Sequence, residues 1–269
     1  MPLLVLVNII ATGTPWFDTG KLPILIAAII AIGIVLIATY HRRSRERFQL
    51  RKIAGLEAVE EAIGRATEMA RPLLYTPGWG GDIQRPTTIA SMNILSHVAA
   101  RAARYDCQLV YPTHDPVIMS VAQEVVKESY VQEGLADRFN EDNIRYVSSS
   151  QFGYAAAVEG LITRLEPASI FLLGTFEAES LIMAETGNFV GAIQIAGTDS
   201  TIQLSFFIVA CDYTLIGEEL FAASGYLSGD QSILASVRAQ DMMKLIIMVL
   251  LLIAVIWASF APDSTWWRF

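Results

Sequence analysis

The sequence predicts an α/β protein, and two observations lead to this prediction. Between residues 56 and 240, apolar runs of about four to eight residues alternate with helical patterns of about ten or more. Such alternation is typical of a mainly parallel sheet that helices cover on both faces. On each side of this region lies an apolar run long enough to cross a bilayer. We therefore expect a three-layer, Rossmann-like domain inserted between two transmembrane helices.

The composition agrees with a chain that lies partly in lipid. Of its 269 residues, 53% are hydrophobic and 17% are charged, and the mean hydropathy is +0.44. Soluble domains of this size are rarely so hydrophobic. The same figures exclude a disordered or collagen-like chain. With only two cysteines, the chain is not a disulfide-rich secreted scaffold.

Charge is distributed unevenly along the chain. Residues 53–241 carry 24 acidic and 10 basic side chains, a net charge of −14. An acidic region of this kind argues against a nucleic-acid partner, because phosphate backbones need a basic surface. The basic excess is concentrated in residues 41–52, which contain six arginines and lysines directly after an apolar run.

Residues 22–40 and 242–260 are the two expected spans. The first has nineteen residues without a charge, which as a helix would measure about 29 Å. The second contains one charge, Lys244, close enough to its end to reach the headgroups. Aromatic residues at its far end and beyond it are typical of an interfacial belt. They are Trp257, Phe260, Trp266, Trp267 and Phe269.

The arginine cluster predicts which side of the membrane each segment occupies. Positively charged loops stay in the cytoplasm, so the basic juxtamembrane segment 41–55 and the α/β domain 56–240 are expected there. Segments 1–21 and 261–269 would then lie outside a plasma (inner) membrane crossed twice. The apolar start of the chain, residues 2–11, is too short to span. It is either an interfacial segment or a signal-like stretch.

The helices of the α/β domain are expected from amphipathic periodicity and from capping residues. We predict caps at Asp115, followed by a proline, at Ser150, and at Thr87 or Thr88. The expected helices cover residues 56–70, 87–105, 116–132, 150–166, 177–185 and 215–224. A last helix, capped by Ser228 or Asp230, can continue into the second span.

The strands are expected where short apolar runs stand between these helices. They cover residues 73–76, 107–111, 144–147, 169–173, 190–195 and 205–210. The link between the last two lacks room for a crossover helix, so an antiparallel pair is expected at that edge of the sheet.

Candidate ligand contacts follow the carboxyl ends of the strands, where open parallel sheets bind their ligands. The glycine-rich turn after the first strand and the serines before residue 151 precede helix starts, which can hold an anion. The candidates are Gly78, Trp79, Gly80, Gly81, His114, Asp115, Ser148, Ser149, Ser150, Thr175 and Glu177. The alternative is that these residues only make turns and helix caps.

No catalytic, metal or cofactor site is expected. The three histidines, at 41, 97 and 114, are scattered, and no CxxC or HxxxH pattern occurs. The glycine-rich turn matches neither the dinucleotide fingerprint nor the P-loop, and no Gly-x-Ser-x-Gly elbow is present.

Three stretches of the sequence carry a family resemblance. They are residues 55–62 (GLEAVEEA), 75–78 (YTPG) and 113–116 (THDP). With them the chain, over roughly residues 45–240, resembles a family of prokaryotic membrane proteins described only as a domain of unknown function. The resemblance implies a membrane location. It implies no activity and no functional residues.

Two functions fit these observations, and a third, an enzyme that uses His114 with a neighbouring carboxylate, stays open beside them. The first is a non-catalytic, membrane-anchored protein whose copies assemble on the cytoplasmic face. Its partners would be the lipid bilayer, further copies of the chain and a companion membrane subunit. The apolar ends of the chain, residues 1–17 and 262–269, would contact neighbours. The alternative is a ligand-responsive module that binds a nucleotide or a small anionic metabolite at the strand ends.

Overall fold

The computed structural model describes residues 28–30, 32–34, 54–229 and 231–260. The chain divides into two compact units. One spans Glu46–Leu234 and contains the sheet, and the other combines Met1–Arg45 with Ala235–Phe269.

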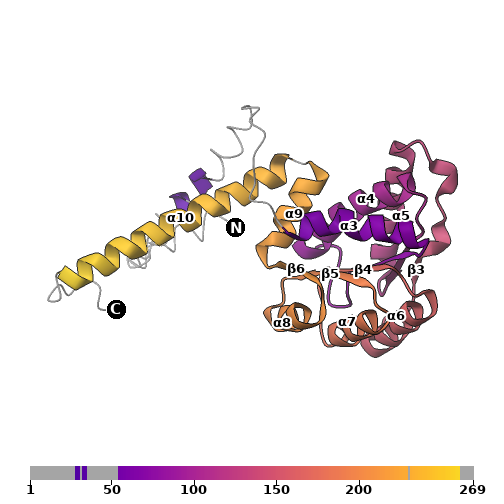
Figure 1. Cartoon of the computed structure of the whole chain (residues 1–269). Coiled ribbons are helices and arrows are strands. Elements are labelled where there is room, and N and C mark those ends of the chain that lie inside the picture. The colour runs from indigo at the N-terminus through magenta and orange to yellow at the C-terminus, as the bar shows by residue number, and fades with distance from the viewer. Residues whose placement is uncertain (1–27, 31, 35–53, 230, 261–269) are drawn as a thin grey trace, which may run out of the picture. The chain divides into compact units, whose positions relative to one another are not determined.

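Six strands form one parallel sheet within the described residues, which confirms the α/β class (Figure 1). They are β1 (Leu73–Thr76), β2 (Leu109–Thr113), β3 (Ile144–Tyr146), β4 (Ser169–Leu173), β5 (Ile193–Thr198) and β6 (Tyr213–Ile216). Their order in the sheet is β3-β2-β1-β4-β5-β6. The direction of winding therefore reverses between β1 and β4, as in Rossmann folds.

Helices cover both faces of this sheet (Figure 1). On one face lie α3 (Ala54–Met69), α4 (Pro86–Arg104), α5 (Pro116–Gln132) and α9 (Glu218–Ser228). On the other lie α6 (Gln151–Leu165), α7 (Glu179–Phe189) and α8 (Thr201–Ala210). Two short 3₁₀ turns, η3 (Ala136–Arg138) and η4 (Glu141–Asn143), precede β3. The last helix, α10, spans Gln231–Phe260.

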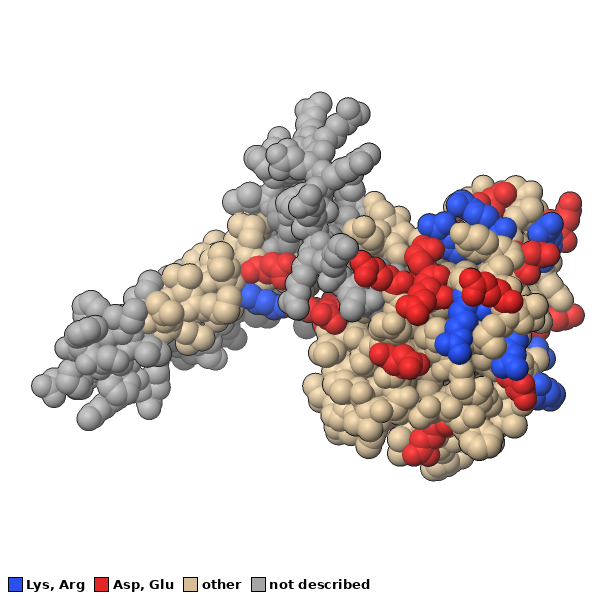
Figure 2. All heavy atoms as spheres, in the orientation of Figure 1, with Lys and Arg blue, Asp and Glu red and all other residues tan. Residues whose placement is uncertain are grey.

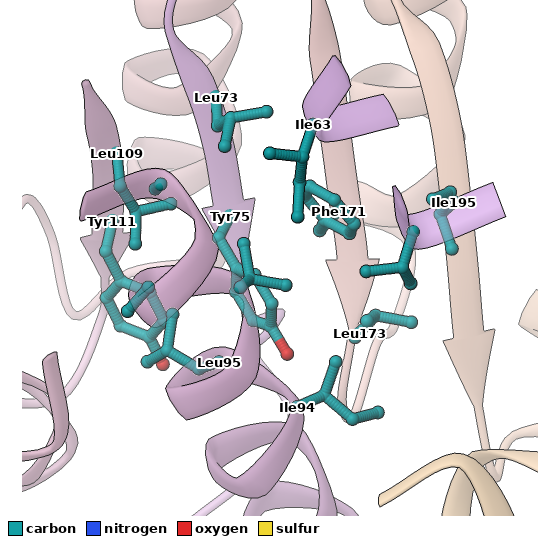
Figure 3. Packing of buried hydrophobic residues seen from close by; sticks show 14 of the residues in the cluster. Ile63, Leu73, Tyr75, Ile94, Leu95, Leu109, Tyr111, Phe171, Leu173 and Ile195 are labelled. Carbon is teal, nitrogen blue, oxygen red and sulfur yellow. The ribbon is translucent and has the colours of Figure 1, made fainter. Parts of the chain in front are cut away.

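Buried side chains form one apolar cluster on each face of the sheet. In the larger cluster, the Tyr75 ring stacks between those of Tyr111 and Phe171, with 5.7 Å between centroids on each side (Figure 3). The Tyr75 hydroxyl donates to the Ser91 carbonyl at 2.7 Å, so its polar end has a partner inside the core. Each fully buried large side chain of this kind stabilises the fold by about 2 kcal/mol.

Two predicted helix caps are confirmed and one is wrong. The Asp115 carboxylate accepts from Val117 N at 2.6 Å and Ser150 Oγ from Gly153 N at 3.1 Å. Thr87 and Thr88 cap nothing, because α4 begins earlier, at Pro86. Proline suits that first position, since its fixed φ is helical and no N–H is lost. Both threonines are buried in the first turn.

The prediction for the edge after β5 is also wrong. Residues 205–210 belong to helix α8 instead of a strand, and β6 covers four residues near the start of the expected helix 215–224. Because α8 provides the crossover in ten residues, β6 pairs with β5 in parallel and no antiparallel pair forms. A short apolar run without charges has no clear period, so it fits a buried strand and a short helix equally well.

Both transmembrane spans stay predictions. Of residues 22–40, only the helical residues 28–30 and 32–34 are described, and in 242–260 the side chains beyond Leu252 lie outside the described part. Within the part of the chain that is described, no helix combines the length and the apolar character that crossing a bilayer requires. The segments 1–21, 41–53 and 261–269, together with Asp230, also lie outside the described residues.

Candidate functional site

The predicted ligand site lies where the strand order reverses. The loops after β1 (77–85) and after β4 (174–178) leave neighbouring strands and lead to α4 and α7, which lie on opposite faces of the sheet. In open α/β sheets, ligands bind in the crevice between such loops. We call these two segments the switch-point loops.

The switch-point loops are hydrogen-bonded to each other. Thr175 N donates to the Pro77 carbonyl and Gly80 N to the Thr175 carbonyl, each at 3.0 Å. Glycine is required on both sides of this contact: a Cβ at Gly78 would collide with the Thr175 carbonyl, and one at Gly174 with the Pro77 carbonyl. Both glycines also have positive φ, at 79° and 151°. The loops therefore close on each other at the place where a ligand would enter.

Glu179 connects three segments beneath these loops. Its side chain is buried, with 1% of the residue exposed. One carboxylate oxygen accepts from Trp79 N and Glu177 N, each at 3.0 Å. The other accepts from Gln151 Nε2, at the start of α6, at 2.9 Å. Buried carboxylates need this number of donors, because desolvation of an unpaired charge is costly.

His114 holds the same loop from the β2 side. Its Nδ1 lies 3.1 Å from the Gly78 carbonyl, and its ring contacts those of Trp79 and Tyr154, with centroids 5.9 and 5.8 Å away. Burial lowers the pKa of His114 from its ordinary value of 6.5, and the Asp115 charge offsets only part of this shift. The imidazole is therefore neutral at pH 7. The Tyr154 hydroxyl bonds to that of Thr76, and burial raises the pKa of Tyr154.

Most of the predicted residues meet at this edge of the sheet. Besides the contacts above, Trp79 Nε1 donates to the Ser149 carbonyl at 2.9 Å, and Gln151 Nε2 lies 3.4 Å from a Glu177 oxygen. Gly81 lies against the Thr88 hydroxyl. The predicted residues in this group are Gly78, Trp79, Gly80, Gly81, His114, Ser149, Thr175 and Glu177. Asp115 and Ser150 instead act as caps, and Ser148 Oγ accepts from Ser150 N at 3.2 Å.

Sequence reasoning did not select Glu179, Gln151 or Tyr154. Glu179 and Glu177 both follow β4, and no local pattern distinguishes the buried carboxylate from the exposed one. The difference arises from donors on other elements, such as Trp79 N on the β1 loop. Those donors come together only in the folded sheet.

A cavity of about 250 Å³ opens at the opposite edge of the sheet, beside the start of β2. Its polar lining residues bond to each other: Arg138 pairs with Asp106 at 3.0 Å, and Gln108 Nε2 donates to Asn143 Oδ1 at 2.9 Å. Burial raises the pKa of the Cys107 thiol there to about 11, which keeps it protonated. In the described part of the chain, no three His, Cys, Asp or Glu residues are grouped to hold a metal ion.

The buried histidine predicts a pH dependence of stability. Because the pKa of His114 is lower in the folded than in the unfolded chain, the unfolded chain binds more protons between these two values. The contribution of His114 to the free energy of unfolding is therefore complete above pH 6.5 and is lost as the pH falls below that value.

The variant His114→Asn tests this dependence, because it keeps an N–H donor near the Gly78 carbonyl and removes the titration. We expect urea unfolding at pH 7.5 and 5.5 to show a smaller loss of stability in this variant than in wild type. An equal loss in both proteins would contradict the prediction.

The fold and the closed switch-point loops define a Rossmann-like α/β protein with one parallel sheet. A protein-family model described as "Domain of unknown function (DUF6754)" matches residues 12–266, and the chain belongs to this family. This confirms the family resemblance, whereas its membrane and prokaryotic aspects stay predictions. Neither the curated proteins nor the solved structures contain a match to the chain.

Proposed function

We propose that the protein is a non-catalytic, membrane-anchored α/β subunit whose copies assemble into a homo-oligomer. Residues 22–40 and 242–260 anchor it in the plasma (inner) membrane, and the α/β unit faces the cytoplasm. A companion membrane subunit can take part in the same assembly. This function uses the closed switch-point loops as scaffold and requires no reaction at them.

The exposed apolar surface of α10 is the observation that carries the proposal. Met242 and residues 245–252 are each between 39% and 61% exposed. Consecutive residues of a helix point to all of its sides, so this part of α10 is apolar all round. Water does not favour such a surface, whereas lipid or other apolar segments do. Ile29, Ile30 and Ile32, in the region of the first span, are likewise 52–60% exposed.

Charge supports the cytoplasmic placement of the α/β unit. The six basic residues at 41–52 adjoin the first span, and Lys244 lies near the start of the second. Lys127, the lone lysine of residues 53–241, is exposed on α5 and can report on sidedness. An impermeant amine reagent should leave Lys127 unmodified in intact cells and modify it after lysis. Modification in intact cells would overturn the placement.

The contacts of the switch-point loops favour a structural role over catalysis. Glu179 uses both carboxylate oxygens as acceptors, and His114 is neutral and lies against the Gly78 carbonyl. The carboxylates of Glu177 and Glu179 also oppose an anionic ligand at this edge. The groups that would have to act in a reaction are therefore engaged in holding the loops together.

The mass of the solubilised particle tests the proposed assembly. The full chain should be extracted from its native membrane in mild detergent and measured by light scattering, with the detergent contribution subtracted. We expect a protein mass of at least two chains, that is, twice 29.5 kDa or more. A particle of one chain would contradict the proposal, and recovery of the chain without detergent would contradict the membrane anchor.

A further inference from the structure

The outer side of α8 exposes an apolar surface at one end of the helical layer. Helix α8 has the sequence TIQLSFFIVA and contains no charged residue. Ile202, Phe206 and Val209, four and three residues apart, lie on one side of the helix, and Ile202 and Val209 are 68% and 88% exposed. Ile208 is also exposed. The surface over α8 is tan in Figure 2, without the red and blue that mark much of the body.

Two neighbouring elements extend this surface. Phe189 is 88% exposed at the end of α7, which packs beside α8. Both helices run opposite to the strands, so Phe189 lies at the same edge of the sheet as Val209. Ile216, on the edge strand β6, is half exposed. It alternates with the buried Leu215, whose side chain packs on the other face, so it points to the side of α8. We call this surface the α8 face. It consists of Phe189, Ile202, Phe206, Ile208, Val209 and Ile216.

Only the interior side of α8 is fixed by packing. Phe207 is fully buried and meets the Phe176 ring edge-on at 5.1 Å. Gln203 Oε1 accepts from Ser180 Oγ at 2.6 Å. None of the residues of the α8 face belongs to the buried apolar clusters, so a function outside the single folded unit is a physical reason to keep this face apolar.

We propose that the α8 face is the surface by which two copies of this chain meet. This inference rests on the assembly proposed above and names the contact within it. The six side chains are 39–88% exposed, so they form the apolar centre that an interface of the usual ~800 Å² per partner requires. Two copies anchored in one membrane share an orientation, so a two-fold axis along the membrane normal can bring the same face of each together.

Charge identifies a second copy as the occupant in preference to lipid. Residues 53–241 carry a net charge of −14, so two such units repel each other over most of their surfaces. Helix α8 itself carries no carboxylate, and the acidic residues next to it in the chain are confined to its flanks, at Asp199 and Asp212. A membrane surface is a poor partner, because helices that lie on membranes carry lysine and arginine beside the apolar side, and α8 has neither.

The test places a charge in the contact and compares it with the same charge elsewhere. Val209→Glu sets two like charges against each other across the two-fold axis. Val131→Glu is the matched control, since Val131 is also the penultimate residue of its helix, is 53% exposed, and lies on the opposite layer. Both are made in the full chain in detergent. We expect Val209→Glu to lower the particle mass to a smaller multiple of 29.5 kDa and to raise the apparent dissociation constant at least about tenfold. Val131→Glu should leave both unchanged.

A second variant guards against misfolding. Ile202→Asp adds its charge in the first turn of α8, where an acidic side chain stabilises the helix, and should also lower the mass. A multimeric particle whose mass neither variant changes would overturn the α8 contact and leave the proposed assembly intact, whereas a monomeric wild type would contradict both. Loss of a co-purifying chain with an unchanged copy number would assign the face to a companion subunit. Weaker attachment to lipid vesicles with unchanged mass would assign it to the membrane. Each of these two results overturns the proposal.

Discussion

Gly174→Ala is expected to lower the free energy of unfolding by about 4 kcal/mol, which is much of what a domain of this kind has. Gly174 has a φ of 151°, a conformation that alanine rarely adopts, at a cost of about 1–3 kcal/mol. Its new Cβ would also collide with the Pro77 carbonyl, and backbone must move to relieve this at a similar cost. The shift would break the contacts between Thr175 and the β1 loop.

Urea unfolding of the solubilised full chain, followed by far-ultraviolet circular dichroism, measures this loss. Gly160→Ala is the matched control, because Gly160 lies in the middle of α6 and its Cβ would meet nothing within 4 Å. Alanine is the better helix former there, so this variant should gain about 0.5–1 kcal/mol. A loss below about 1 kcal/mol for Gly174→Ala would mean that the switch-point loops yield easily and do not act as a rigid scaffold.

Elements with strong local signals were predictable from the sequence. The range of α5 is confirmed to the residue, because Asp115 and Pro116 mark its start chemically. The ranges of β1 and β4 are also confirmed, since each is a short apolar run between helix signals. Residues 205–210 had no such marker. They belong to helix α8, because the parallel strands β5 and β6 need a crossover helix between them.

The site was predictable in place but not in its contacts. Strand ends of a parallel sheet meet at one edge, so the loops after β1 and β4 could be brought together from the sequence. Which groups would be buried depended on strand order. The chain positions of Trp79 and Glu179 are distant, and their bond exists because β1 and β4 are neighbours. Such pairings follow from topology and leave no mark in a local pattern.

Glu179→Ala is expected to cost about 3 kcal/mol and to loosen the switch-point loops. The substitution removes the acceptor of Trp79 N, Glu177 N and Gln151 Nε2 together. Hydrogen bonds to a charged group stabilise by about 1.5–3 kcal/mol, and buried donors without a partner add a penalty. Urea unfolding measures the loss, and faster hydrogen exchange at the Trp79 and Glu177 amides would locate it.

Two further variants separate this role from a general effect of charge. Glu177→Ala removes an exposed carboxylate two residues away and should change stability by no more than about 0.5 kcal/mol. Glu179→Gln keeps an oxygen for Trp79 N and Glu177 N but opposes its amide to that of Gln151. The loss of unfolding free energy for Glu179→Gln should lie between the losses for Glu179→Ala and Glu177→Ala, because Gln151 can turn its amide to present oxygen. Equal losses for Glu179→Ala and Glu177→Ala would show that the buried carboxylate does not hold the loops, and the scaffold role of this edge would then have to be abandoned.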